Sequence, residues 1–208
     1  MTEQELAELI ATGHEVPGVE FKPPGPRTDA YLFATVTRAV LGMANRADGG
    51  LVIVGVDEDA AAGLVPTGLS AQDLPTWSFD DVTAGLAAAA DPFVTIVIEP
   101  SEYRGVTLLV IRVHEFETVP VICKRQFLDP RNQARQVLRP GACYVRTRRK
   151  PETSEIPSQT EMRELLDLGI RKGIRQFLER AAAAGLKLPT GTPQTDDDLF
   201  DADLGDFR

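Results

Sequence analysis

The chain has 208 residues, of which 43% are hydrophobic and 25% are charged, and its net charge is -9. These values are typical of a globular protein with one full hydrophobic core, and no stretch approaches the roughly 18 consecutive apolar residues of a membrane span. The two cysteines are too few for a disulfide framework, and the N-terminal residues do not resemble a secretory signal. We therefore expect a reduced, cytoplasmic protein that does not associate with membranes.

The first predicted elements are a helix and a short strand. A Thr-x-x-Glu capping box opens a helix over residues 3–12, which Gly13 ends. After a Pro-Gly turn, apolar and charged residues alternate. This alternation predicts a strand over 19–22 with Glu20 and Lys22 on one face.

The next helix leads into the most apolar part of the chain. Asp29 caps a helix predicted over 30–45, and a Gly49-Gly50 turn precedes the apolar run 51–56. A near-continuous apolar run is typical of a central strand covered on both faces. Asp57 is the first charged residue after this run, so we expect it at the carboxyl end of the strand, where α/β proteins often place sites.

Helix and strand signals continue to alternate after residue 57. We expect irregular chain over 58–78, a basic loop over 126–141 and a connector over 151–158. The remaining predicted elements are helices over 79–90 and 161–184 and strands over 93–99, 106–113, 119–125 and 142–147. The whole pattern predicts an α+β protein whose mixed, largely antiparallel sheet is flanked by helices.

The positive charges are concentrated in one segment. Between Lys124 and Lys150 the chain has nine lysines and arginines and one acidic residue, Asp129, so the segment carries +8 and the rest of the chain carries -17. Because affinity for a polyanion follows local phosphate contacts, such a segment can bind nucleic acid even in a net-acidic protein. The alternative is a solvated loop paired with acidic neighbours. The candidate nucleic-acid contacts are Lys124, Arg125, Arg146, Arg148, Arg149 and Lys150.

The composition changes after residue 187. Residues 188–208 alternate acidic and apolar side chains, and such segments are usually disordered in isolation. We interpret 1–187 as one core domain and 188–208 as a flexible acidic tail. The sharper alternative is a docking segment that contacts a protein partner or covers the basic segment.

Common nucleotide and zinc motifs are missing. The chain has neither Gly-x-x-x-x-Gly-Lys-Ser/Thr nor Gly-x-Gly-x-x-Gly. His114, Cys123 and Cys143 lack the number and spacing of a structural zinc site, so we expect buried apolar cysteines.

The candidate catalytic residues are Glu15, Glu20, Asp57 and Lys22. Carboxylate oxygens are the ligands that Mg²⁺ and Mn²⁺ prefer, and a bound metal lowers the pKa of a water that can attack a phosphodiester. A lysine nearby can stabilise the charge that develops on the phosphate. The spacing alone is weak evidence, because exposed acidic residues are common.

Two motifs around these residues resemble the Schlafen core domain, also called the Schlafen AlbA or divergent AAA domain. The first motif is Glu-x-x-x-x-Glu-Phe-Lys, which ends at Lys22. The second is Ala44-Asn45, followed by Gly49-Gly50 and Gly55-Val56-Asp57, and the Tyr144-Val145-Arg146 strand is similar to the closing strand of the family. The resemblance covers residues 5–180, and His14 departs from it, because the family usually has glycine directly before the first glutamate.

The resemblance implies a Schlafen core-like fold and a metal-dependent endoribonuclease that cuts tRNA or other structured RNA, with RNA favoured over DNA. By position it implies Glu15, Glu20 and Asp57 as ligands of Mg²⁺ or Mn²⁺, with Lys22 as the neighbouring lysine. Other members are regarded as DNA- or ATP-binding modules, so a non-catalytic DNA- or RNA-binding regulatory module is the alternative. Animal members join two core lobes into a clamp, whereas this chain has one core, so a homodimer is expected to build the groove.

Overall fold

A four-stranded sheet organises the first part of the chain. Its strand order is β1-β2-β7-β6, with strands Val19–Lys22, Gly50–Val54, Val106–Val113 and Ile96–Tyr103. β1 and β2 are parallel, whereas β2 and β7, and β7 and β6, are antiparallel. The protein is therefore α+β with a mixed, largely antiparallel sheet, as the sequence predicts.

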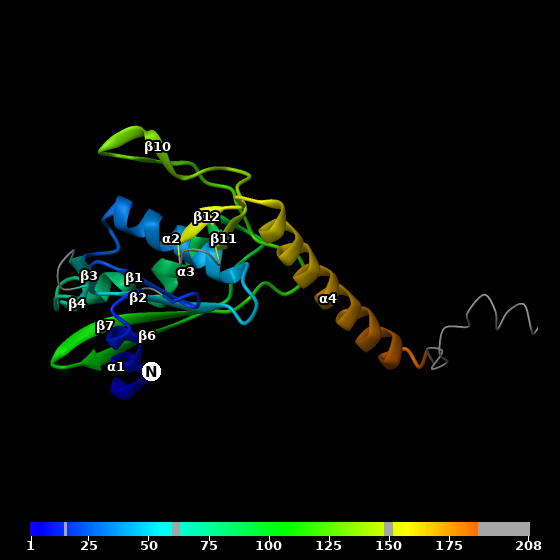
Figure 1. Cartoon of the computed structure of the whole chain (residues 1–208), viewed down its shortest axis with the longest axis horizontal. Helices are drawn as coiled ribbons and strands as arrows, with labels where there is room; N and C mark the ends of the chain where they lie inside the picture. The colour runs from blue at the N-terminus through cyan, green and yellow to red at the C-terminus, as the bar shows by residue number, and fades with distance from the viewer. Residues whose placement is uncertain (15, 60–62, 148–151, 187–208) are drawn as a thin grey trace, which may run out of the picture. The chain divides into compact units, whose positions relative to one another are not determined.

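The computed structural model describes residues 1–14, 16–59, 63–147 and 152–186 (Figure 1). The chain divides into two compact units, Met1–Ile170 and Arg171–Arg208. The predicted acidic tail, 188–208, lies outside the described residues. Within the described ranges, no helix is long and apolar enough to cross a membrane.

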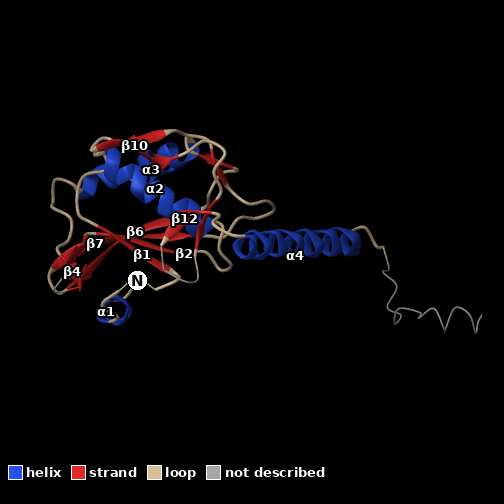
Figure 2. Ribbon diagram, turned by 45° about the horizontal axis from the view of Figure 1, so that its top comes forward, coloured by secondary structure: helices blue, strands red, loops and turns tan. Residues whose placement is uncertain are grey.

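Hydrophobic cores cover both faces of the sheet. The helices that form them are α1 (Glu3–Ala11), α2 (Ala30–Ala44) and α3 (Phe79–Ala87). Figure 2 shows α2 and α3 on one face and α1 on the other. Val52 and Val54 of β2 belong to the core under α2, whereas Ile53 belongs to the core against α1. β2 is thus the central strand buried on both faces that its apolar sequence predicts.

The signals at the helix ends are confirmed. The capping box of α1 is present, because the Thr2 side chain accepts from the Glu5 backbone and the Glu5 side chain accepts from the Thr2 backbone. Gly13 follows with φ of +69°, a left-handed conformation that glycine adopts without strain. The Asp29 carboxylate caps α2 by accepting hydrogen bonds from two backbone N–H groups in its first turn.

The apolar run 51–56, predicted as one strand, is broken in two. Gly55 has a φ of +110°, and there the chain leaves the sheet. β3 (Val56–Asp59) then pairs with β4 (Gly63–Pro66) as a separate hairpin. Asp57 therefore lies inside a hairpin strand and not at the tip of the central strand.

Several segments predicted as irregular contain short elements. Part of 58–78 forms β4 and the short 3-10 helix η1 (Leu74–Trp77), and part of 151–158 forms β12. The predicted basic loop contains the antiparallel pair β9 (Phe127–Asp129) and β10 (Asn132–Leu138), which register shifts interrupt. The other short strands are β5 (Ala90–Asp91), β8 (Ile122–Cys123), β11 (Tyr144–Arg146) and β12 (Thr153–Glu155), and they pair as β5-β8 and β11-β12.

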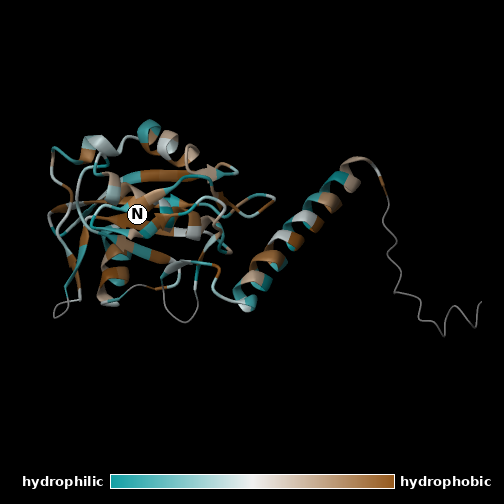
Figure 3. Cartoon of the chain, turned by 90° about the horizontal axis from the view of Figure 1, so that it is seen from above, coloured by the Kyte–Doolittle hydropathy of each residue, from teal (hydrophilic) through white to brown (hydrophobic). Residues whose placement is uncertain are grey.

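The last helix, α4, spans Gln159–Ala183, close to its predicted bounds. In the first unit, Leu165 and Leu168 of α4 belong to the core under α2. Figure 3 shows hydrophobic and hydrophilic residues alternating along α4.

Candidate functional site

The register of β1 directs Glu20 toward the face of the sheet that α2 covers. Glu20 pairs with Val52 and Lys22 pairs with Val54, and both valines belong to the core under α2. Glu20 is only 6% exposed. A carboxylate this deeply buried is costly unless both of its oxygens are hydrogen-bonded.

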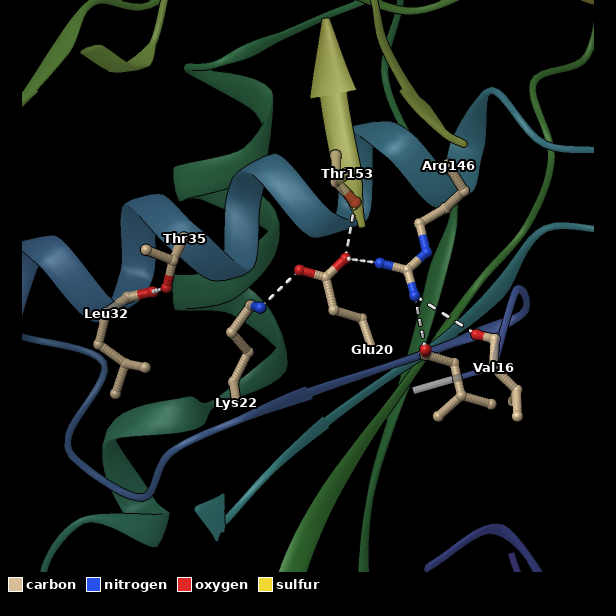
Figure 4. Close-up of polar contacts among 8 residues, drawn as sticks. Val16, Glu20, Lys22, Leu32, Thr35, Arg146 and Thr153 are labelled. Carbon is tan, nitrogen blue, oxygen red and sulfur yellow. Dashed lines mark hydrogen bonds and ion pairs between the residues drawn. The ribbon is translucent and has the colours of Figure 1, made fainter. Parts of the chain in front are cut away.

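Three side chains donate hydrogen bonds to Glu20 (Figure 4). The Lys22 Nζ donates to Oε1 at 2.5 Å. The Arg146 guanidinium donates to Oε2 at 2.8 Å, and the Thr153 hydroxyl donates to the same oxygen at 2.6 Å. We call these four residues the Glu20 cluster. The predicted pairing of Glu20 and Lys22 on one strand face is observed, whereas no sequence signal pointed to Thr153.

Arg146 lies inside the molecule. Its side chain is 1% exposed, and it also donates to the backbone carbonyls of Val16 at 3.3 Å and Val19 at 2.8 Å. It thereby ties β11 to β1 and to the segment before it, as Figure 4 shows. The sequence grouped Arg146 with the nucleic-acid contacts, but the structure gives it partners within the protein.

The ionised state of Glu20 is favoured within this cluster. Burial alone would raise the pKa of the Glu20 carboxyl. The charges of Lys22 and Arg146, with hydrogen bonds from Lys22 and Thr153, outweigh burial and hold that pKa below its ordinary value of 4.5. Glu20 is therefore a carboxylate at neutral pH, neutralised by two internal cations.

Asp57 has different partners from the Glu20 cluster. Its Oδ2 accepts a hydrogen bond from the Thr67 hydroxyl at 3.0 Å. The Gly55 carbonyl, two residues earlier, accepts from the backbone N–H groups of Thr67 and Gly68 at 2.9 and 2.8 Å. Within the described residues, no hydrogen bond or ion pair joins Asp57 to Glu20 or Lys22.

The predicted metal trio is only partly described. Glu15 lies outside the described residues. Among the residues that the structure does describe, no group of three or more histidines, cysteines, aspartates and glutamates could hold a metal ion. Glu20 and Asp57 therefore do not form a site for Mg²⁺ or Mn²⁺ by themselves, and His114 with the two cysteines does not form a zinc site.

Both cysteines are free thiols, as expected. Cys123 is buried, and burial raises the pKa of the half-buried Cys143 thiol to about 11. Burial raises the pKa of the Cys123 thiol as well, so both cysteines favour the neutral thiol form at neutral pH.

Exposed basic side chains gather in residues 124–138, which we call the basic hairpin region. Its members are Lys124, Arg125, Arg131 and Arg135. The Arg135 side chain is 63% exposed and makes a long ion pair of 3.9 Å with Asp129, and Arg131 lies 5.6 Å from the ring centre of Tyr31. Such contacts leave the guanidinium groups in water. The predicted contacts Arg148, Arg149 and Lys150 lie outside the described residues.

A cavity of about 290 Å³ adjoins the basic hairpin region. Its lining includes Arg27, Arg125, Phe33 and Phe127. The Arg27 guanidinium lies over the Phe33 ring at 5.0 Å and is 3.8 Å from the Asp81 carboxylate. Phe33 is 8% exposed and is covered by Arg27, so the two arginines and the half-buried Phe127 are the groups that an anionic ligand could meet. Sequence analysis did not indicate this cavity, because its lining comes from separate segments.

Asn45 is a buried polar residue with a structural role. Its amide nitrogen donates to the carbonyls of Val121 at 2.8 Å and Tyr144 at 2.9 Å, and its amide oxygen accepts from the Val121 N–H at 2.7 Å. Asn45 therefore joins the end of α2 to the segment before β8 and to β11. The only sequence signal for this role was the Ala44-Asn45 motif.

Two solved structures show weak similarity to this chain. The DIP2311 protein from Corynebacterium diphtheriae matches with a TM-score of 0.43 and 17% identity, over 67% of this chain and 25% of that chain. The N-terminal domain of a RecG-related protein from Nitrosomonas europaea matches with a TM-score of 0.43 and 25% identity, over 61% of this chain and 82% of that chain.

The match thus spans a quarter of the length of the DIP2311 protein. At TM-scores below 0.5, neither structure assigns a fold or a function to this chain. No family model matches the chain, and no curated protein matches it.

Proposed function

We propose that this protein is a nucleic-acid-binding module that uses the basic hairpin region to contact phosphates. One observation carries the proposal: the four described basic residues of this region are exposed, whereas the cations of the Glu20 cluster are paired inside the protein. An exposed cation can exchange its counterions for phosphate groups, which is the main source of affinity for nucleic acid.

The adjoining cavity supports single-stranded nucleic acid as the ligand. Bases stack on aromatic rings only when they are not already stacked in a duplex, and the half-buried Phe127 lines the cavity beside Arg27 and Arg125. RNA is proposed ahead of DNA on the strength of the motifs that resemble Schlafen nucleases.

Fluorescence anisotropy with a labelled single-stranded RNA, and with DNA of the same sequence, tests this proposal. Arg131→Ala with Arg135→Ala should weaken binding at least about tenfold at low salt and should reduce the slope of log affinity against log salt by about 1.4, or 0.7 for each lost phosphate contact. The matched control is Arg104→Ala with Arg112→Ala, which removes two arginines that are exposed elsewhere. Equal affinities for the two double variants, or no binding by the wild type at low salt, would refute the proposal.

The second candidate function is metal-dependent RNA cleavage, and the contact between Lys22 and Glu20 on one strand face favours it. In this proposal Glu15, Glu20 and Asp57 would hold Mg²⁺ or Mn²⁺, which supplies Lewis-acid chemistry when bound. Lys22 would stabilise charge on the phosphate.

Asp57→Asn is the sharpest test of cleavage, because Asp57 is half-exposed, whereas a change at Glu20 would also break its buried contacts with Lys22 and Arg146. The measurement is cleavage of tRNA with Mn²⁺, and Glu58→Gln is the control for loss of an exposed acid on the same strand. Cleavage by the wild type that Asp57→Asn abolishes and Glu58→Gln retains would support a nuclease. Equal cleavage rates for the wild type and the two variants would rule out a nuclease function for Asp57. This result would not affect the proposal that the protein binds nucleic acid.

A further inference from the structure

The cavity that adjoins the basic hairpin region lies at the start of α2. Its lining comes from the first two turns of that helix, from α3 and the residues just after it, and from the basic hairpin region. Figure 1 shows β10 beside α2, and Leu138 of β10 also lines the cavity. The volume of about 290 Å³ is close to the lower end of the range of roughly 300–1,000 Å³ that small-molecule sites span. The cavity is therefore suited to one small ligand or to a single nucleotide of a strand.

Arg27 is held firmly at the wall of this cavity. Its guanidinium lies 5.0 Å from the centre of the Phe33 ring, and its backbone N–H donates to the Thr76 hydroxyl at 2.9 Å. Gly85 lines the cavity, and a Cβ placed on it would be 3.6 Å from the Arg27 Nη1 and 2.5 Å from the Phe33 ring. The missing side chain at Gly85 thus leaves room for both groups, and the guanidinium is positioned before any ligand binds.

The hydrogen-bonding capacity of the cavity arginines is not used within the described part of the chain. The Arg27 guanidinium donates no hydrogen bond there, and its ion pair with Asp81 is 3.8 Å long. The Asp81 carboxylate already accepts from the Ser78 hydroxyl at 2.6 Å. Arg125 is exposed, and its side chain likewise has no hydrogen-bond partner among the described residues. Because a guanidinium carries several N–H donors in a planar fork, the two arginines can donate to the oxygens of a ligand.

The charge of the lining favours a doubly charged anion. The lining contains two arginines and, among the residues that the structure describes, no carboxylate. A phosphate monoester carries a charge of about -1.5 to -2 at neutral pH, whereas a phosphodiester inside a strand carries a single charge. Arginine binds phosphate oxygens in a bidentate manner, and the half-buried Phe127 ring offers a surface for the group that the phosphate is attached to.

We propose that this cavity binds a phosphate monoester, with Arg27 and Arg125 donating to the phosphate and Phe127 contacting the attached nucleoside. Such a monoester occurs at the end of a nucleic-acid strand and on a free mononucleotide. The first source rests on the proposed binding of nucleic acid, and the second does not.

Three pairs of probes test the ligand on the full chain. Two pairs are single-stranded RNAs of one sequence with a phosphate or a hydroxyl at the 5′ end, or at the 3′ end, and fluorescence anisotropy measures their affinities. The third pair is uridine monophosphate and uridine, measured by isothermal titration calorimetry. The wild type should bind the phosphorylated member of at least one pair about tenfold more tightly, because the extra hydrogen bonds join charged groups.

The pairs also distinguish the two sources. A preference in an RNA pair identifies the strand end as the ligand, and a preference confined to uridine monophosphate identifies the free mononucleotide. Equal affinities within all three pairs would overturn the proposal. A wild type that binds no RNA at low salt would refute the proposed function, and the uridine pair would then decide the role of the cavity by itself.

Substitution of Arg27 assigns the preference to this cavity. Arg27→Gln should reduce the preference for the phosphorylated probe to about twofold or less. Arg38→Gln is the matched control, because the Arg38 guanidinium lies 5.1 Å from the centre of the Tyr144 ring but does not line the cavity. The Nε atoms of Arg27 and Arg38 are both buried without a hydrogen-bond partner among the described residues, so the two changes are comparable in their cost to the fold. Arg38→Gln should keep the full preference.

Arg125→Gln keeps the test decisive if Arg27→Gln does not fold, which far-ultraviolet circular dichroism would show. Arg125 is exposed, so its loss should leave the fold intact and should also reduce the preference for phosphate. An unchanged preference in the folded variants of Arg27 and Arg125 would overturn the proposal. A loss of preference in Arg38→Gln as large as that in Arg27→Gln would overturn it too, because the phosphate would then not be recognised in this cavity.

Discussion

The Glu20 cluster and the basic hairpin region contain the same types of charged side chain in opposite settings. In the Glu20 cluster, Lys22 and Arg146 hold a carboxylate that is 6% exposed. In the basic hairpin region, Arg135 is 63% exposed and its ion pair is 3.9 Å long. Burial and partners, and not charge type, therefore decide whether a cation stabilises the fold or remains available to a ligand.

Removal of Arg146 is the most severe way to test this comparison. Arg146→Met keeps an apolar stem of similar length but leaves Glu20 buried with less compensation, which should lower the free energy of unfolding by about 3–5 kcal/mol. Urea unfolding followed by circular dichroism measures this loss. Arg139→Met is the control, because its ion pair with Glu155 is exposed, and it should shift the midpoint very little. Similar shifts for both variants would remove the distinction between the two settings.

Substitution of Asn45 tests whether a buried, uncharged side chain stabilises the fold as the Glu20 cluster does. Asn45→Ala leaves the Val121 N–H and the Tyr144 carbonyl without their partner, so the free energy of unfolding should fall by about 2–3 kcal/mol. The control is Asn132→Ala, because among the described residues the Asn132 side chain accepts only an exposed local hydrogen bond from the Ala134 N–H. An Asn45→Ala midpoint equal to that of the wild type would contradict the buried role.

The pH dependence of stability isolates the charge on Glu20. The pKa of Glu20 is lower in the folded state than its ordinary value of 4.5, so the unfolded chain takes up the proton first as pH falls. The contribution of Glu20 is therefore complete above about pH 4.5 and is lost as pH falls through the lower, folded-state pKa. Unfolding midpoints measured between neutral and acidic pH should fall less steeply for Glu20→Gln than for the wild type. Parallel curves would show that another group is responsible.

The smallest effect on stability is expected in the basic hairpin region. Arg135→Ala should leave the urea midpoint unchanged, because its charge is in water, and should weaken RNA binding a few-fold through loss of one phosphate contact. Anisotropy and unfolding data on one preparation check both parts. A lower urea midpoint with an unchanged affinity for RNA would instead assign Arg135 to stabilising the fold.

Local sequence signals predicted the main elements well. The Thr2 capping box, the Asp29 cap and the alternation around Glu20 act between neighbouring residues, so the sequence is sufficient to place them. The break at Gly55 was missed because an apolar run shows no interruption, whereas the backbone there takes a conformation that depends on contacts with Thr67 and Gly68.

The candidate site was less predictable than the fold. Glu20 and Lys22 could be placed on one face from strand periodicity, but Arg146 and Thr153 reach Glu20 from more than 120 residues away along the chain. A basic residue in a basic segment gives no sign that it will be buried. Arg146 is buried because it bonds to Val16 and Val19, more than 120 residues earlier in the chain, and the sequence pattern does not encode these contacts locally.

The close packing of the Gly55 and Gly68 backbones has a consequence for protein engineering. A Cβ added to Gly55 would come within 3.2 Å of the Gly68 Cα, and a Cβ added to Gly68 would come within 2.7 Å of the Val106 side chain. Gly55 connects β2 to β3, so its backbone conformation sets the position of Asp57. A side chain at either glycine would shift the Asp57 carboxylate without altering Asp57 itself, so variant libraries that aim to retune this acid should keep both glycines fixed.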